Sequence, residues 1–168
     1  DMEQTQDILT AVDLMLSEYE LDKGYNSYNE YIGEISHTDI VKYSCQPTQY
    51  PNLKIMASFP SDERFNEFAY QHFKDDPMQA TKLLRERVID HVIDDFDIIF
   101  IDVSPALNPL VWCAMESATG LIVPVTPRQL DWMATGTFFE HLPERLLRLP
   151  SKGENINWFK VLLNNVET

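Results

Sequence analysis

Asp97-Ile98-Ile99-Phe100-Ile101-Asp102-Val103 is the stretch of sequence that decides the fold. Four large apolar residues in a row, at 98–101, are typical of a strand that is buried on both faces. Strands of this kind belong to parallel sheets that are covered by helices. Asp102 follows the apolar run at the point where such a strand ends. The stretch therefore predicts a parallel strand that carries one carboxylate at its carboxyl end.

Helical and strand patterns alternate on both sides of this stretch. Before it, apolar spacing predicts a helix over 4–20, followed by a long irregular connection over 22–52. A strand is predicted at 53–58. Two helices are predicted after that strand, the first capped by Ser61 or Asp62 and the second running from Pro77 to about 95. After it, the pattern predicts a helix over 108–118, a strand at 120–125, a helix over 128–141 that Pro143 restarts, and a strand at 158–163. Alternating strands and helices indicate a single α/β domain over 1–168, with a mostly parallel sheet flanked by helices in three layers.

Composition narrows the class of protein further. The chain has 168 residues, of which 44% are hydrophobic, so it can form a real core. No apolar stretch is long enough for a membrane span, and we expect no membrane association. The formal net charge is −14, and residues 1–50 alone hold 10 acidic and 2 basic residues. Such a surface repels phosphate backbones, so these residues by themselves are a poor candidate for non-specific DNA binding.

The cysteines and histidines give no metal pattern. Cys45 and Cys113 have no CxxC partner, and the four histidines show no ligand spacing, which disfavours zinc. One disulfide between the two cysteines stays open, and free thiols in a reducing cytoplasm are the simpler interpretation.

Ligands of open parallel sheets bind at the carboxyl ends of the strands, which places candidate chemistry after Ile101, Val125 and Leu163. Four apolar residues followed by Asp102 have the form of a Walker B strand, whose carboxylate holds Mg²⁺ directly or through water beside nucleotide phosphates. The alternative is that Asp102 caps the turn at Ser104-Pro105. None of the five glycines lies in a phosphate-binding loop with an adjacent Lys-Ser/Thr pair, so the sequence holds no Walker A loop.

The stretch from Leu83 to Leu149 resembles the ParA family of partition ATPases, in particular the larger plasmid and phage type and the RepA proteins of repABC plasmids. The resemblance rests on the order of its parts: a helix, the strand of form D-x-x-x-x-D, a Pro-containing turn, a helix, a second strand with a Pro-rich turn, and a helix with an aromatic pair. The segment 47–65 is also similar to the family's preceding strand. The turn Ser104-Pro105 departs from the family's usual PP or GP.

The resemblance implies a P-loop NTPase-like fold of the deviant Walker A superfamily and an ATPase that uses ATP and Mg²⁺. It implies ATP-dependent dimerisation, stimulation by a ParB-type centromere-binding partner, DNA binding through regions outside this chain, and a cytoplasmic, nucleoid-associated role in segregating plasmids or chromosomes. Asp102 matches the Walker B acid. Asn164, Thr126 and Pro127 match positions on the nucleotide side. The family's catalytic lysines would precede Asp1, so we expect the middle part of a longer ATPase, incomplete at both ends, with no catalytic residue of its own.

Two other hypotheses remain at the level of sequence. The chain is alternatively a non-catalytic scaffold or localisation protein of the same superfamily that has lost its P-loop, or an unrelated nucleotide-binding α/β domain. Arg128 is a candidate contact for phosphate or a partner, and the segment Tyr25–Tyr31 is a candidate partner surface. Asp1-Met2-Glu3-Gln4 is faintly similar to a D-x-D-P-Q segment of the family, without an assigned role.

Overall fold

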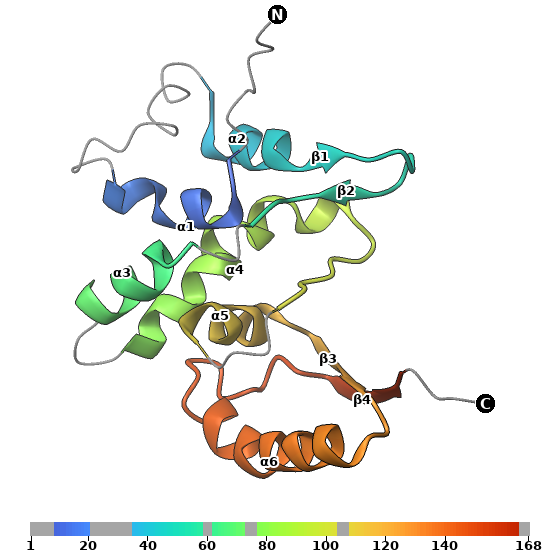
Figure 1. Ribbon diagram of the computed structural model, residues 1–168. Coiled ribbons are helices and arrows are strands. Elements are labelled where there is room, and N and C mark those ends of the chain that lie inside the picture. The colour runs from blue at the N-terminus through green and yellow to red at the C-terminus, as the bar shows by residue number, and fades with distance from the viewer. Residues whose placement is uncertain (1–8, 21–34, 59–61, 73–76, 104–107, 165–168) are drawn as a thin grey trace, which may run out of the picture.

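The computed structural model describes residues 9–20, 35–58, 62–72, 77–103 and 108–164 (Figure 1). The α-helices are α1 (Ala11–Glu20), α2 (His37–Ser44), α3 (Arg64–His72), α4 (Leu83–Arg87), α5 (Pro109–Ser117) and α6 (Gln129–Leu146). Short 3₁₀ segments are η2 (Pro77–Lys82), η3 (Ile89–His91) and η4 (Ile93–Asp95). The strands are β1 (Gln46–Pro47), β2 (Lys54–Ile55), β3 (Gly120–Val125) and β4 (Trp158–Leu163).

Side-chain caps fix where several helices begin. In α1, the backbone N–H of Thr10 donates to Asp13 Oδ2 at 2.7 Å, and the N–H of Asp13 donates back to Thr10 Oγ1 at 3.2 Å. This reciprocal pair is a capping box, and it starts α1 at Ala11, while residues 4–8 of the predicted helix lie outside the described residues. In α5, Asn108 Oδ1 accepts from the N–H of Val111 at 3.1 Å, and Pro109 occupies the first turn.

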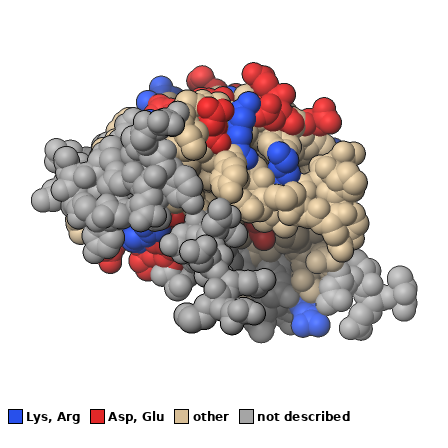
Figure 2. Space-filling model, turned by 90° about the horizontal axis from the view of Figure 1, so that it is seen from above, with Lys and Arg blue, Asp and Glu red and all other residues tan. Residues whose placement is uncertain are grey.

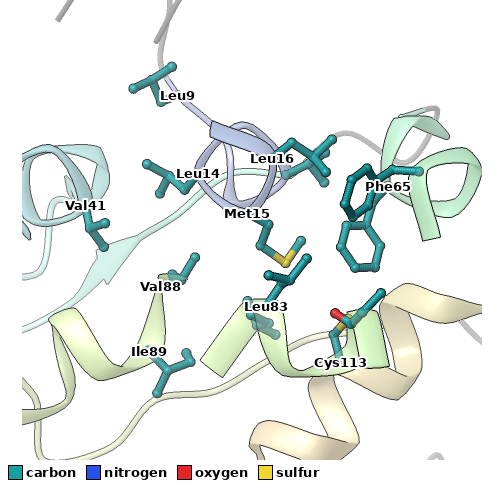
Figure 3. Packing of buried hydrophobic residues seen from close by; sticks show 14 of the residues in the cluster. Leu9, Leu14, Met15, Leu16, Val41, Phe65, Leu83, Val88, Ile89 and Cys113 are labelled. Atoms are coloured by element: carbon teal, nitrogen blue, oxygen red, sulfur yellow. The ribbon is translucent and has the colours of Figure 1, made fainter. Parts of the chain in front are cut away.

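The main core lies among the helices of the first two thirds of the chain. Met15 of α1 and Leu83 of α4 point toward each other, and Cys113 of α5 lies below Phe65 of α3 (Figure 3). Phe65, Val12, Leu14 and Cys113 have no exposed surface. The buried members of this cluster are Leu9, Val12, Leu14, Met15, Leu16, Ile40, Val41, Phe65, Phe68, Ala69, Ala80, Leu83, Leu84, Val88, Ile89, Val92 and Cys113.

β3 and β4 form a parallel sheet, as the sequence predicts for 120–125 and 158–163. The register pairs Gly120 with Trp158 and Val125 with Leu163. The sheet face that holds Leu121 and Phe159 packs against α6, where the rings of Phe139 and Phe159 meet edge to face with centroids 5.4 Å apart. Two parallel strands with the helix α6 between them in sequence confirm the α/β fold class.

The opposite face of the same sheet is open to solvent within the described part of the chain. Ile122 is 48% exposed and Leu162 is 55% exposed, and Trp158 lies on this face as well. Parallel sheets are normally covered on both faces because their strands are apolar throughout. One apolar face of this sheet is therefore left uncovered by the residues that the structure describes, and the end of β4 is also open on the α6 side, where Val161 is 48% and Leu163 is 56% exposed.

The prediction of a buried strand over 97–103 is wrong for this structure. Residues 98–103 form no ladder with any described strand, and Ile98 is 68% and Phe100 79% exposed. A segment forms a strand only where a neighbouring strand pairs with it. The described strand β3 pairs with β4 and not with residues 98–103. The apolar run therefore connects η4 toward α5 as a non-helical segment without strand partners (Figure 1).

Three other segments differ from expectation. The predicted strand at 53–58 is reduced to β2, which pairs antiparallel with β1 in a short hairpin around 48–53. The predicted helix from Pro77 to 95 begins at Pro77, yet it is divided into η2, α4, η3 and η4. Pro143 does not restart α6, which runs through it from Gln129 to Leu146. The long connection predicted over 22–52 contains the short helix α2.

The charged surface reflects the acidic composition. Seen from the end that carries α2 and the β1–β2 hairpin, acidic side chains gather along one border, with a few basic ones between them (Figure 2). Among the described residues, no helix is long and apolar enough to cross a membrane.

Candidate functional site

The carboxyl ends of β3 and β4 lie side by side. Val125 pairs with Leu163 in the last register position, and the N–H of Asn164 donates to the carbonyl of Val125 at 2.9 Å. Thr126 and Asn164 therefore leave the sheet at the same edge, next to each other. The structure brings together the residues that sequence selected after the two strands, and this edge is where open α/β sheets bind ligands.

A tight turn leads from this edge into α6. The N–H of Arg128 donates to the carbonyl of Thr126 at 2.8 Å across Pro127. Arg128 occupies the N-cap position of α6, and its side chain makes no capping hydrogen bond. The first N–H groups of an 18-residue helix thus begin within three residues of the strand end. Backbone N–H groups and the positive end of the helix dipole favour a negative group at such a place.

Asp102 lies on the exposed 98–103 segment. Its carboxylate forms no hydrogen bond or ion pair with the described residues, and its side chain is open to solvent. Mg²⁺ is commonly held by one or two carboxylates together with water and substrate phosphates. Asp102 fits that donor set as a single carboxylate. The described residues contain no group of three or more His, Cys, Asp or Glu side chains that would hold a metal by themselves.

A buried carboxylate that the sequence did not single out anchors the entry to β4. Glu116, 7% exposed in the last turn of α5, accepts from the N–H of Ser151 at 3.1 Å and from its hydroxyl at 2.7 Å. Asn155 Nδ2 donates to the backbone carbonyl of Glu116 at 3.1 Å. The turn over 151–155 is thereby tied to α5 just before β4 begins. The signal available in the sequence was the position of Glu116, an acidic residue that directly follows the apolar run 109–115.

The two cysteines are free thiols. Cys113 is fully buried, and burial raises the pKa of its thiol above the ordinary value. Burial also raises the pKa of the half-buried Cys45 thiol, with the positive charge of Lys54 acting in the opposite direction. The disulfide that the sequence left open is not formed, and neither thiol has the lowered pKa of a nucleophile.

Two tryptophans lie near the sheet and differ in burial: Trp112 is buried in the second apolar cluster, whereas Trp158 is 47% exposed on the uncovered sheet face. The remaining sequence candidates are not described by the structure. The segment Tyr25–Tyr31, residues 1–4 and the turn Ser104-Pro105 lie outside the described residues.

Comparison with known proteins places the chain in a family. Residues 5–144 match the family model AAA_31, which is described as an AAA domain, so the chain belongs to that family. The fold is that of a partition protein: a solved structure with that title superimposes with a TM-score of 0.65, at 24% identity, and covers 96% of this chain and 42% of the other.

Curated relatives point to one branch of that family. A protein of Escherichia coli named plasmid partition protein A is 24% identical over 143 residues, which is 79% of this chain and 35% of the relative. Protein SopA of Escherichia coli (strain K12) is 30% identical over 124 residues, 73% of this chain and 31% of the relative. A Sinorhizobium fredii protein, named as a replication protein A, is 27% identical over 132 residues, which is 73% of this chain and 31% of the relative.

The chain spans about a third of the length of these curated relatives. The resemblance to ParA-type partition proteins that the sequence predicted is confirmed.

Proposed function

We propose that this chain is the central part of a ParA-type ATPase that segregates plasmid or chromosomal DNA. The observation that carries the proposal is the shared edge at which Thr126 and Asn164 leave two parallel strands, beside the first turn of α6. A nucleotide that occupied this edge would have its base near Asn164 and Thr126-Pro127. Asp102 would hold Mg²⁺ through its water shell, and the metal would neutralise phosphate charge.

Exposed apolar surface supports the idea that further elements complete this ATPase. The side chains at 98–101 and the open face of the β3–β4 sheet are large and apolar, and they would cost free energy in water. Phosphate binding needs a glycine-rich loop with lysine, which these 168 residues do not contain. In this proposal such a loop and its strand come from the polypeptide before Asp1.

The remaining features of the proposed function follow from the family rather than from these residues. The ATP-loaded protein would form a dimer, a ParB-type partner would stimulate hydrolysis, and the protein would act in the cytoplasm on the nucleoid. DNA would be bound through regions outside this chain, because its own charge of −14 opposes contact with phosphates.

The first test is the reading frame upstream of Asp1 in the source DNA. A strand followed by a glycine-rich loop with two lysines and a Ser/Thr would support the ATPase. A frame that starts at or near Asp1 without this loop would overturn it. The chain would then be the P-loop-less scaffold of the same superfamily, and binding of a protein partner would be its testable activity.

The second test measures hydrolysis by the intact polypeptide. We expect Asp102→Asn to lower Mg²⁺-dependent ATPase activity by a factor of roughly 100 or more, as loss of a metal-positioning carboxylate does. The matched control is Asp94→Asn, which changes an exposed aspartate of η4 outside the D-x-x-x-x-D stretch and should leave the rate within about twofold. Equal rates in the two variants would refute the role of Asp102.

A further inference from the structure

A cavity of about 430 Å³ is lined by residues of α3, η2, α5 and the end of α6, and its described lining includes none of Thr126, Pro127 and Asn164. Its walls carry Tyr70, Met78, Trp112, His141, Arg145 and Arg148. Aromatic residues, Met and Arg are the types that are enriched in protein interfaces and their hot spots. The volume is that of a ligand pocket rather than a packing defect.

Arg145 is held in the cavity by an aromatic ring. Its guanidinium carbon lies 5.5 Å from the centre of the Trp112 ring, which is 8% exposed and belongs to the second apolar cluster. This cation–π contact positions the cation without neutralising it. No described carboxylate forms an ion pair with Arg145.

Among the described residues that line the cavity, basic groups exceed acidic ones by one charge, in a protein that is acidic overall. Arg145 and Arg148 supply two positive charges, and Glu144, which pairs with Arg148 at 2.9 Å, supplies one negative charge. That pair is two-thirds exposed, so water screens it, and a competing carboxylate can replace Glu144 at little cost. The excess of positive charge contrasts with the net charge of −14 over the chain.

We propose that this cavity binds an acidic peptide segment of a partner protein. A carboxylate of the segment would accept hydrogen bonds from the guanidinium groups of Arg145 and Arg148, a geometry that planar guanidinium favours. A neighbouring apolar side chain would contact Met78 and Tyr70, which line the same cavity. Binding at this site does not depend on ATP, so an experiment on it tests a proposal that is separate from the proposed ATPase.

The test measures fluorescence anisotropy of a labelled acidic hexapeptide, acetyl-Leu-Glu-Phe-Asp-Glu-Leu-amide, with the purified protein. The matched probe replaces each acidic residue by its amide. We expect the acidic probe to bind at least about tenfold more tightly, with affinity that falls as salt is added. Arg145→Met keeps an unbranched side chain on the Trp112 ring and should weaken binding about tenfold.

The control variant is Arg85→Met, which removes an arginine that pairs with Asp90 on the outside of α4. It should bind the acidic probe like the unchanged protein. If circular dichroism shows that Arg145→Met does not fold, Arg148→Met carries the test, because that side chain is 67% exposed. Equal binding of the two probes, or equal binding by Arg145→Met, would overturn the proposal. Displacement of the acidic probe by inorganic phosphate would also overturn it, in favour of a plain anion site.

Discussion

Glu116 and Ser151 are joined by hydrogen bonds across 35 residues of sequence, from the end of α5 to the turn that precedes β4. The carboxylate accepts from both the backbone N–H and the hydroxyl of Ser151. The N–H of Asn157 donates to the carbonyl of Thr119 at 2.9 Å immediately afterwards. These bonds set β4 beside β3, and through that pairing they bring Asn164 to Thr126.

Glu116→Ala should therefore destabilise the protein by about 2–3 kcal/mol, because it leaves the N–H and hydroxyl of Ser151 without their charged acceptor in a partly buried site. Glu116→Gln should cost less, since its amide oxygen still accepts. Urea unfolding followed by circular dichroism gives both values. The exposed Glu154→Ala serves as control, and a loss no larger than that of the control would contradict this role for Glu116.

Asp62 and Arg64 should make stability depend on acid pH. The hydrogen bond from Arg64 lowers the pKa of Asp62, so the pair stabilises the fold fully above the ordinary aspartate value of 3.8 and loses this contribution as the pH falls below it. Asp62→Asn keeps one oxygen that accepts from the backbone N–H of Arg64, and it removes the charge together with the second oxygen, which accepts from Arg64 Nη2. We expect a loss of about 0.5–1 kcal/mol at neutral pH, reduced for the exposure of Arg64, that disappears in acid.

Urea midpoints at neutral pH and at a pH well below 3.8 measure this difference. Asp97→Asn, on an exposed segment, is the control and should change neither midpoint appreciably. A deficit in Asp62→Asn that persists unchanged in acid would show that the charge is not responsible.

The two thiols should react at different rates. Cys113 is fully buried and Cys45 is half-buried, so a thiol reagent should modify Cys45 first in the native protein, with both reacting at equal rates in denaturant. Cys45→Ala and Cys113→Ala assign the two phases. Faster reaction of Cys113 under native conditions would contradict its place in the core.

Alkaline pH should weaken the fold through the same buried thiol. Burial raises the pKa of Cys113 in the folded state, while the unfolded thiol ionises near its ordinary value of 9.0. The contribution is fully present below pH 9.0 and is lost as the pH rises above it, because only the unfolded chain then releases the proton. Below pH 9.0 the urea midpoint of Cys113→Ala should be lower than that of the unchanged protein because of the cavity, and this deficit should shrink above pH 9.0 because only the unchanged protein loses stability there.

Gly120 and Trp158 form a close contact at the start of the sheet. A Cβ atom at residue 120 would lie 2.0 Å from Trp158 Cε2, so Gly120→Ala must displace the indole ring. We expect a loss of about 1–3 kcal/mol, which the double variant with Trp158→Leu should largely restore. Thermal unfolding of the four proteins in the cycle measures the coupling. If the stability losses of the two single variants add up in the double variant, the strain does not come from contact between residue 120 and Trp158.

The sequence predicted most helices of this protein and the two strands β3 and β4 of a parallel sheet, although not that these two pair with each other. Local signals sufficed where the cause is local: Asn108 followed by Pro109 starts α5 because a capping oxygen and a fixed φ act within one turn. The capping box of Thr10 and Asp13 was present in the sequence as well, and it starts α1 at Ala11.

The candidate site was predictable in part. The rule that ligands bind after parallel strands selected Thr126 and Asn164, and the register brings them together. The anchoring role of Glu116 and the cavity at Arg145 were not predictable, because each depends on residues far apart in sequence whose approach no local pattern encodes.

The sequence by itself determined where most helices lie, which segments are apolar enough for a sheet, and the family to which the chain belongs. Tertiary structure decided whether an apolar run becomes a strand, because a ladder needs a partner at hydrogen-bonding distance. Residues 120–125 have that partner in β4, whereas the more apolar residues 98–101 have none among the described residues and stay exposed. Apolar composition allows a segment to pair in a sheet, but the segment becomes a strand only when another strand lies beside it.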